Sequence, residues 1–276
     1  MSLRGGLRLV RVTNLAIAAA GVLAGGWIAL GHVALPKLLA FAVLSALGLG
    51  AAGNTWNDIC DAAADQVNRP PEQRPLSGGR VRRGTADLIV FLGALIGLTT
   101  AALVSGWQVV AALFALAVML AYSPFIKQGP VAGNLAVALI AGLPPFYGAL
   151  ALGAPVAGVV PWVLAAWLHL AREIVKDVED EAGDRAIGRR TLPIVAGRRP
   201  AQVVAAGVGL LFVPASLLLP RSAGYGGAYF LIALIAQMAV LIAATWLIVG
   251  RTDRVSALLK VAMVVGLVAL VAGKVA

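Results

Sequence analysis

Residues 227–249 read GAYFLIALIAQMAVLIAATWLIV, a run without a single charged side chain. About 20 predominantly apolar residues are enough for a helix to cross the ~30 Å hydrocarbon core of a bilayer. The whole chain shares this character, because 61% of its 276 residues are apolar and only 12% are charged. A soluble domain has about 45–50% apolar and about 25% charged residues. The sequence therefore predicts an integral membrane protein.

Nine apolar stretches follow one another along the chain and predict an all-α, polytopic bundle with nine transmembrane helices in one integral-membrane domain, residues 1–276. The stretches lie near residues 13–31, 35–56, 86–105, 107–123, 131–151, 156–172, 200–219, 227–249 and 255–275. Arg4, Arg8 and Arg11 resemble the basic start of a signal peptide. Because a long apolar run follows them without a small-residue cleavage pattern, we expect a retained first helix.

The basic residues are distributed unevenly between the two ends of these spans. With the N-terminus in the cytoplasm, eighteen of the 22 Lys and Arg residues fall on that side, three fall on the other, and Lys260 lies inside the last span. Cytoplasmic segments carry an excess of Lys and Arg. We therefore interpret the net charge of +10 as a topology signal and expect no nucleic-acid partner. The sequence predicts a multi-pass protein of the cell membrane with a cytoplasmic N-terminus and indicates no protein partner.

All twelve acidic residues fall on the same side as the N-terminus, and most lie in two connections, roughly 57–85 and 173–199. The first connection carries aspartates spaced i, i+3, i+7, and the second repeats that spacing 119 residues later; they are Asp58, Asp61 and Asp65, and Asp177, Asp180 and Asp184. Such a spacing places three side chains on one face of a helix. We expect two carboxylate stripes at the ends of the second and sixth spans, a cytoplasmic cap there, and an internal pseudo-repeat of segments 57–69 and 176–188.

Like charges in each stripe destabilise the helix that carries them. We therefore expect a cation that compensates the repulsion. Mg²⁺ takes one or two carboxylates and completes its shell with water and phosphate oxygens, so the pattern predicts a site for a metal and a diphosphate. Asn57, directly before the first stripe, is an expected oxygen ligand. Tyr122 is either a membrane-interface aromatic or a wall of the substrate cavity. Arginines and lysines near the stripes can bind phosphate oxygens; these are Arg69, Arg74, Lys127, Arg172 and Lys176. Lys127 can equally be a topology anchor.

The segments NDICDAAAD (57–65) and KDVEDEAGD (176–184), with the link YSPFIK (122–127), resemble those of the UbiA superfamily of intramembrane prenyltransferases. The resemblance implies Mg²⁺-dependent ionisation of a prenyl diphosphate, with two metal ions, and transfer of the prenyl group to a lipophilic acceptor. It implies that Arg69 and Lys127 hold the diphosphate. It also implies a catalytic metal site of Asn57, Asp61, Asp65, Asp180 and Asp184, supported by Asp58 and Asp177.

The acceptor is indicated by the second segment. REIVKDVEDEAGD (172–184), followed by RTLP (190–193), is similar to the archaeal geranylgeranylglyceryl phosphate geranylgeranyltransferases, which make the second ether bond of archaeal lipids. Arg172 and Lys176 lie one helical turn apart and offer an anion site for a glyceryl phosphate, although either one can instead be a counter-ion for the aspartates.

Two other functions remain as alternatives. An aromatic prenyltransferase of the 4-hydroxybenzoate or quinone type would tend to have a Tyr-Ala pair before the second aspartates, which this chain lacks. A secondary transporter would have ionisable residues near the bilayer midplane, but the middles of all nine predicted spans are free of acids.

Overall fold

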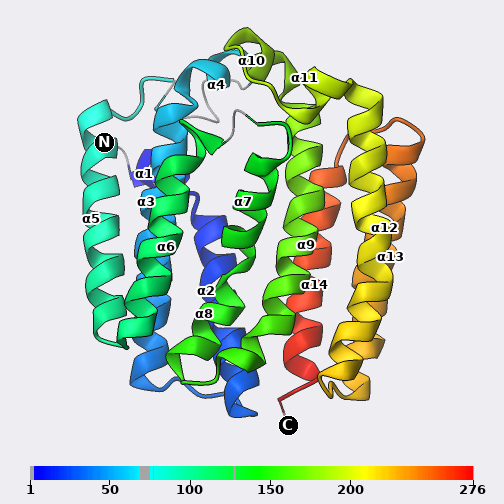
Figure 1. Cartoon of the computed structure of the whole chain (residues 1–276). Coiled ribbons are helices and arrows are strands. Elements are labelled where there is room, and N and C mark those ends of the chain that lie inside the picture. Colours follow the sequence, from blue (N-terminus) through cyan, green and yellow to red (C-terminus); the bar gives the residue numbers. More distant parts are fainter. Residues whose placement is uncertain (1–2, 69–74, 77, 127–128, 276) are drawn as a thin grey trace.

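The computed structural model describes residues 3–68, 75–76, 78–126 and 129–275, and every regular element in these ranges is a helix. The long helices stand side by side in one bundle, and the two termini lie at its opposite ends (Figure 1). The helices are α1 (Leu3–Leu9), α2 (Val12–Leu30), α3 (Lys37–Cys60), α4 (Ala62–Asn68), α5 (Arg83–Ala102), α6 (Gly106–Tyr122), α7 (Ala132–Gly142), α8 (Pro144–Ala151), α9 (Pro155–Glu179), α10 (Glu181–Ala186), α11 (Leu192–Ala196), α12 (Arg198–Ser222), α13 (Gly227–Ile248) and α14 (Val255–Ala272).

Seven helices in the described part of the chain are long and apolar enough to cross a membrane: α2, α3, α5, α9, α12, α13 and α14. The pair α7 and α8 adds an eighth candidate if it is one bent span, and α6, with 17 residues, is shorter than the other candidates. The stretch expected as a single span at 131–151 bends by 41° between α7 and α8. Pro144 and Pro145 open α8, and a proline lacks the N–H that would continue the preceding helix.

The outer surface of the bundle is apolar. Phe91 is 63% exposed, Trp107 is 73% exposed and Leu231 is 71% exposed, although each belongs to an ordered helix. Large apolar side chains in such numbers are unusual on the surface of a soluble monomer, whereas a bilayer solvates them. The exposed surface therefore fits a protein surrounded by lipid.

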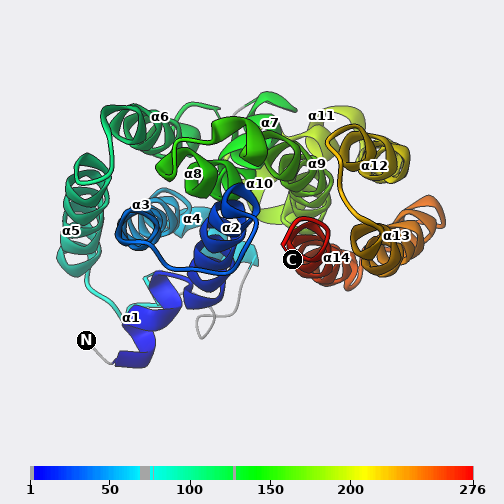
Figure 2. The same cartoon turned by 90° about the horizontal axis from the view of Figure 1, so that it is seen from below.

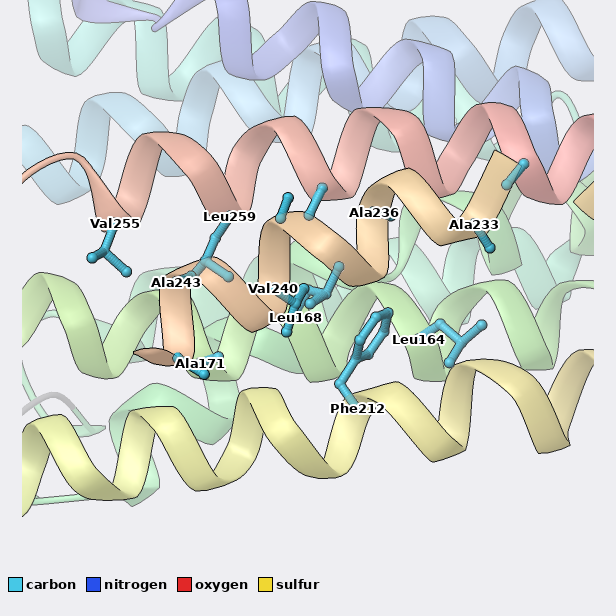
Figure 3. Packing of buried hydrophobic residues seen from close by; sticks show 14 of the residues in the cluster. Leu164, Leu168, Ala171, Phe212, Ala233, Ala236, Val240, Ala243, Val255 and Leu259 are labelled. Atoms are coloured by element: carbon cyan, nitrogen blue, oxygen red, sulfur yellow. The ribbon is translucent and has the colours of Figure 1, made fainter. Parts of the chain in front are cut away.

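Two hydrophobic clusters make up most of the interior. The first comes from α2, α3, α5, α6 and α8, with Val22, Leu39 and Tyr147 among its buried members. The second comes mainly from α9, α12, α13 and α14. Figure 3 shows the second cluster, in which Phe212 of α12 and Val240 of α13 pack towards α9. The two halves of the chain thus build largely separate cores.

Glycines allow α3 and α5 to pack with their backbones close together. A Cβ at Gly48 would lie 2.7 Å from the carbonyl oxygen of Gly93 and 2.8 Å from the nitrogen of Gly97. Backbone atoms cannot yield as a flexible side chain can, so a larger residue would push the helices apart. This contact fixes α3, which carries the first acidic segment at its end.

The two acidic connections meet at one end of the bundle. Helices α4, α10 and α11 lie there (Figure 1), and α4 contacts α10 directly. Seen along the bundle, α2 lies between α3 and α14, with α8 and α9 opposite (Figure 2), and it contacts all four. These helices surround the space beneath the acidic connections.

Candidate functional site

The two acidic segments have the same local backbone. Asp61 follows the last residue of α3 with φ −90° and ψ 2°, and Asp180 follows the last residue of α9 with φ −97° and ψ 6°. The Asp61 N–H donates to the carbonyl oxygen of Asn57 at 2.8 Å, and the Asp180 N–H donates to that of Lys176 at 2.8 Å. Both helices therefore end at the second aspartate of their segment.

We expected the three aspartates of each segment to lie on one continuous helix. This expectation is wrong, because the helix ends at the middle aspartate. The third aspartates lie on the short helices beyond the break, where the Asp65 N–H donates to the Asp61 carbonyl at 2.9 Å and the Asp184 N–H to the Asp180 carbonyl at 3.1 Å. Three carboxylates on one helix face repel one another, and aspartate is a weak helix former. Both effects favour a helix break at the middle aspartate.

Arg189 joins the two segments. Its Nη1 donates to Oδ1 of Asp184 at 2.8 Å, and its Nη2 donates to Oδ1 of Asp61. The Arg189 side chain is 8% exposed. Burial alone would lower the pKa of Arg189, but the two carboxylates outweigh it and keep that pKa above its usual value. A permanent positive charge therefore lies between the first and the second acidic segments.

The first aspartate of each segment is buried against a partner from elsewhere in the chain. Asp58 forms an ion pair with Arg11, which precedes α2. Asp177 accepts a hydrogen bond of 2.9 Å from Nδ2 of Asn134 on α7. Neither aspartate lines the cavity below, so these two carboxylates hold the segments against neighbouring helices.

Both polar atoms of the Asn57 side chain have hydrogen-bond partners. Its Nδ2 donates to Oδ2 of Asp61 at 3.0 Å and to Oγ of Ser123 at 2.8 Å. Its Oδ1 accepts from Nη2 of Arg11 at 2.9 Å. The oxygen expected to bind metal is thus hydrogen-bonded to an arginine.

A cavity of about 870 Å³ extends from the acidic segments into the bundle. At its polar end lie Asn57, Asp61, Asp65, Asp180, Asp184 and Arg189. Farther in, its walls are mainly apolar and include Ile140, Leu164, Phe212, Ala233, Leu267 and Leu270. The site combines a charged end with a long apolar interior, which suits a molecule with an ionic head and a hydrocarbon tail.

The donor set at the polar end fits Mg²⁺ in its chemistry. Oδ2 of Asp184 is buried and has no hydrogen-bond partner among the described residues, so one carboxylate oxygen is available to a ligand. Within the same part of the chain, no group of three or more His, Cys, Asp or Glu side chains is already gathered around a metal position. Arg189 lies between Asp61 and Asp184. Mg²⁺ needs only one or two carboxylates when water and phosphate oxygens complete its shell.

A basic wall also lines the cavity. It consists of Arg172 and Lys176 on α9 and Lys260 on α14, and Arg11 also lines the cavity. Glu173 pairs with Arg172 at 2.7 Å and with Lys176 at 3.5 Å. The Nε of Arg172 is buried without a partner in the described residues. Cations outnumber carboxylates on this wall, which favours a second anionic ligand.

The structure brings most of the predicted site residues together. Asn57, Tyr122, Arg172 and Lys176 all line the cavity, as do the second and third aspartates of both segments. Tyr122, left open between the membrane interface and the cavity, therefore lies at the cavity wall. Three predicted phosphate-binding residues, Arg69, Arg74 and Lys127, lie outside the described residues.

Sequence reasoning missed several contributors. Arg11 and Arg189 counted only as topology charges, Asn134 carried no signal, and Ser123 belonged to the YSPFIK segment without an expected role. His169 also lines the cavity, with a buried Nδ1 that has no partner among the described residues. One signal was present: Lys260 is a lysine inside a predicted span, and ionisable residues there usually have a function.

Comparisons with known proteins agree with this architecture. A model of the UbiA prenyltransferase family matches residues 18–268. The chain is 39% identical over 259 residues to a digeranylgeranylglyceryl phosphate synthase of Thermococcus gammatolerans, covering 93% of this chain and 91% of that one. It is 39% identical over 276 residues to the protein of that name from Natronomonas pharaonis, covering 99% and 98%.

Solved structures share the fold. One, described by its authors as a digeranylgeranylglyceryl phosphate synthase in membranes, has a TM-score of 0.78 at 25% identity and covers 99% of this chain and 98% of that one. A UbiA homologue from Archaeoglobus fulgidus, bound to GPP and Mg²⁺, has a TM-score of 0.63 at 18% identity and covers 96% and 99%.

Proposed function

The chain belongs to the UbiA prenyltransferase family, and on this premise we propose that it transfers a geranylgeranyl group from its diphosphate to geranylgeranylglyceryl phosphate, with Mg²⁺ as cofactor. The relatives named digeranylgeranylglyceryl phosphate synthase support this acceptor. The observation that carries the proposal is the cavity, in which two acidic segments and a basic wall meet at the charged end of an apolar interior.

Asn57 and the second and third aspartates of both segments are the residues that would hold the metal; the aspartates are Asp61, Asp65, Asp180 and Asp184. We propose two ions, one for each segment. Bound Mg²⁺ would neutralise the charge that grows on the departing diphosphate. Asp58 and Asp177 support the site by fixing each segment to Arg11 and to Asn134. Arg69, Arg74 and Lys127 are proposed as further contacts of the diphosphate.

The cavity walls would protect the reacting carbon. When the bond between C1 of the prenyl group and the diphosphate oxygen breaks, the allylic cation needs surroundings free of water. The apolar interior, with residues such as Leu164 and Phe212, supplies them and shields the cation until the acceptor hydroxyl attacks C1. The hydroxyl proton then passes to a carboxylate of the site or to the released diphosphate.

The basic wall supports a phosphate-bearing acceptor over a neutral aromatic one. Arg172, Lys176 and Lys260 line the cavity together, and His169 lines it one turn before Arg172 on α9. Charge-assisted hydrogen bonds from such groups are the usual means of holding phosphate. An uncharged acceptor such as a quinone precursor has no anionic group for these cations to bind.

We also propose nine spans in one domain over residues 1–276, with the N-terminus and the acidic segments in the cytoplasm. The eighteen-to-three distribution of basic residues supports this orientation. Cysteines introduced at Ala196 and Arg221 of a protein lacking Cys60 are then expected to react with a membrane-impermeant reagent from opposite faces. Labelling of both from the same face would contradict this topology.

The deciding experiment is incubation of the purified protein with geranylgeranyl diphosphate, Mg²⁺ and one acceptor at a time. We expect product with geranylgeranylglyceryl phosphate, its loss in EDTA and its return on addition of Mg²⁺. Efficient prenylation of 4-hydroxybenzoate instead would identify an aromatic prenyltransferase. No product with either acceptor, together with solute uptake by proteoliposomes, would point to a transporter.

A further inference from the structure

Arg189 links two segments that lie far apart in the sequence. It is 128 residues from Asp61 and five residues from Asp184, and it binds the Oδ1 atom of each. Its side chain is almost completely buried. Two carboxylates therefore share a single guanidinium at the polar end of the cavity.

The backbone holds Arg189 in this place. Gly188 has a φ of +73°, a conformation that favours glycine, and it turns the chain back after α10. The N–H of Arg189 then donates to the carbonyl oxygen of Asp184 at 2.9 Å. The neighbouring Arg190 is exposed, so the turn directs one of two consecutive arginines into the site.

A guanidinium and a divalent cation compete for such carboxylates. Oδ1 of Asp61 and Oδ1 of Asp184 both accept from Arg189, whereas Oδ2 of Asp184 is buried and has no partner among the described residues. A buried carboxylate oxygen without a partner is costly and points to a ligand that the pair with Arg189 does not supply.

We propose that Arg189 is the internal counter-ion of the metal-free protein, and that Mg²⁺ can bind Asp61 and Asp184 fully only after Arg189 releases them. The released guanidinium remains at the end of the cavity, where its planar fork suits the oxygens of a diphosphate. This inference rests on the proposed Mg²⁺-dependent function. It assigns Arg189 a positioning role and an exchange of partners rather than a part in the bond-breaking step.

The first test compares Arg189→Gln with Arg190→Gln, its matched control. Mn²⁺ binding is measured by electron paramagnetic resonance in the absence of substrate, and thermal unfolding is measured in EDTA. Because Arg189→Gln removes the competitor, we expect Mn²⁺ to bind about fivefold or more tightly and the metal-free protein to unfold at a lower temperature. Arg190→Gln should match the unmodified protein in both. Mn²⁺ affinity that is unchanged or weaker in Arg189→Gln would overturn the proposal.

The second test needs no variant, so it holds even if Arg189→Gln fails to fold. Unmodified protein is treated with phenylglyoxal in EDTA or in Mg²⁺, and modification of each arginine is measured by mass spectrometry. We expect Mg²⁺ to increase the reaction of Arg189 and to leave that of Arg190 unchanged. If Arg189 stays equally protected in Mg²⁺, it is not released, and any tighter Mn²⁺ binding reflects lost charge alone.

The two proposals can fail separately. Product formation by the unmodified protein tests the prenyl transfer, whereas Mn²⁺ binding and phenylglyoxal modification test the exchange at Arg189. Product without any exchange would remove only this inference. Exchange without product from either acceptor would remove the proposed function.

Discussion

The acidic segments 57–65 and 176–184 have the same aspartate spacing and the same helix break, but they are stabilised in different ways. Asp58 of the first segment is buried against a cation, Arg11. Its counterpart Asp177 is buried against a neutral amide, Asn134. The backbone is thus repeated between the two segments, while these two partners differ in charge.

The residues before the aspartates also differ between the segments, but here it is the second segment that carries the positive charge. At an offset of 119 residues, Arg172 and Lys176 of α9 correspond to Gly53 and Asn57 of α3. The first segment therefore takes its positive charge from another element, whereas the second carries its own one turn away. Equivalent positions in a repeat can therefore take different roles: on the proposed function, one helix would supply only metal ligands and the other would supply an anion site as well.

The largest effect is expected where the segments are most alike. Asp61→Asn and Asp180→Asn each replace the aspartate at the helix break, and both should lower kcat by about 10²–10³ or more, because a preorganised charge at the leaving group is lost. Single-turnover assays would measure the effect, and circular dichroism would show that the helices persist. Full activity in either variant would break the equivalence of the segments.

The next largest effect is expected at the partners of Asp58 and Asp177, the first aspartates of the two segments. Arg11→Met leaves Asp58 buried without its cation and should lower the free energy of unfolding by about 3–5 kcal/mol. Asn134→Ala removes one hydrogen bond from Asp177 and should cost about 1.5–3 kcal/mol. Thermal unfolding in detergent would rank the two variants.

An exposed arginine, Arg80, provides the control for these stabilities, and Arg80→Met should change little. Adding Asp58→Leu to Arg11→Met removes both charges and should recover much of the loss. If Arg11→Met lowers the free energy of unfolding no more than Asn134→Ala does, the cation beside Asp58 stabilises the fold no more than the amide beside Asp177.

The third prediction tests the difference in charge between the residues that precede the aspartates of the two segments. Lys176→Asn gives the second segment the residue of the first, and it should raise the acceptor's KM while leaving that of geranylgeranyl diphosphate unchanged. A charge-assisted bond to phosphate contributes about 1.5–3 kcal/mol, which corresponds to a rise of about 10- to 100-fold. Steady-state kinetics with each substrate varied in turn would measure it, with Arg80→Asn as control. Equal losses for both substrates would make Lys176 a counter-ion of the acids.

The smallest effect is expected at Ser123. Its hydroxyl, in the described end of the link after α6, accepts from Asn57 at 2.8 Å, and Ser123→Ala should cost about 0.5–1.5 kcal/mol. We expect the unfolding temperature to fall by about 2–4 °C for each kcal/mol, with kcat nearly unchanged because Asn57 keeps its bonds to Asp61 and Arg11. A large loss of activity would show that the position of Asn57 depends on this one bond.

The sequence predicts the elements of the fold well, because each span is a long apolar run and each acidic segment has a regular spacing. The predicted span at 227–249 matches α13, for example. The bend between α7 and α8 was not predicted, since a pair of prolines inside an apolar run leaves open whether the helix kinks or ends.

The site was predictable only where residues act as part of a pattern. Asp61 and Asp184 belong to a repeat and were expected at the site, and both line the cavity, whereas Arg189 belongs to no pattern and makes its contact with a residue 128 positions away. Asn134 likewise depends on how α7 packs beside α9. Contacts of this kind depend on tertiary packing, which spacing along a chain does not encode.

The division of the interior into two cores has a consequence for assembly. With the exception of Ile28, the first cluster uses residues before α9 and the second uses residues from α9 onwards. During synthesis the N-terminal helices can therefore bury their cluster before the C-terminal helices have left the ribosome. The contacts between the acidic segments form only after both segments have been made, since Asp61 and Arg189 are 128 residues apart and closing a loop of this length costs entropy. A chain truncated after α8 should insert and fold its own half, yet it can never close the site.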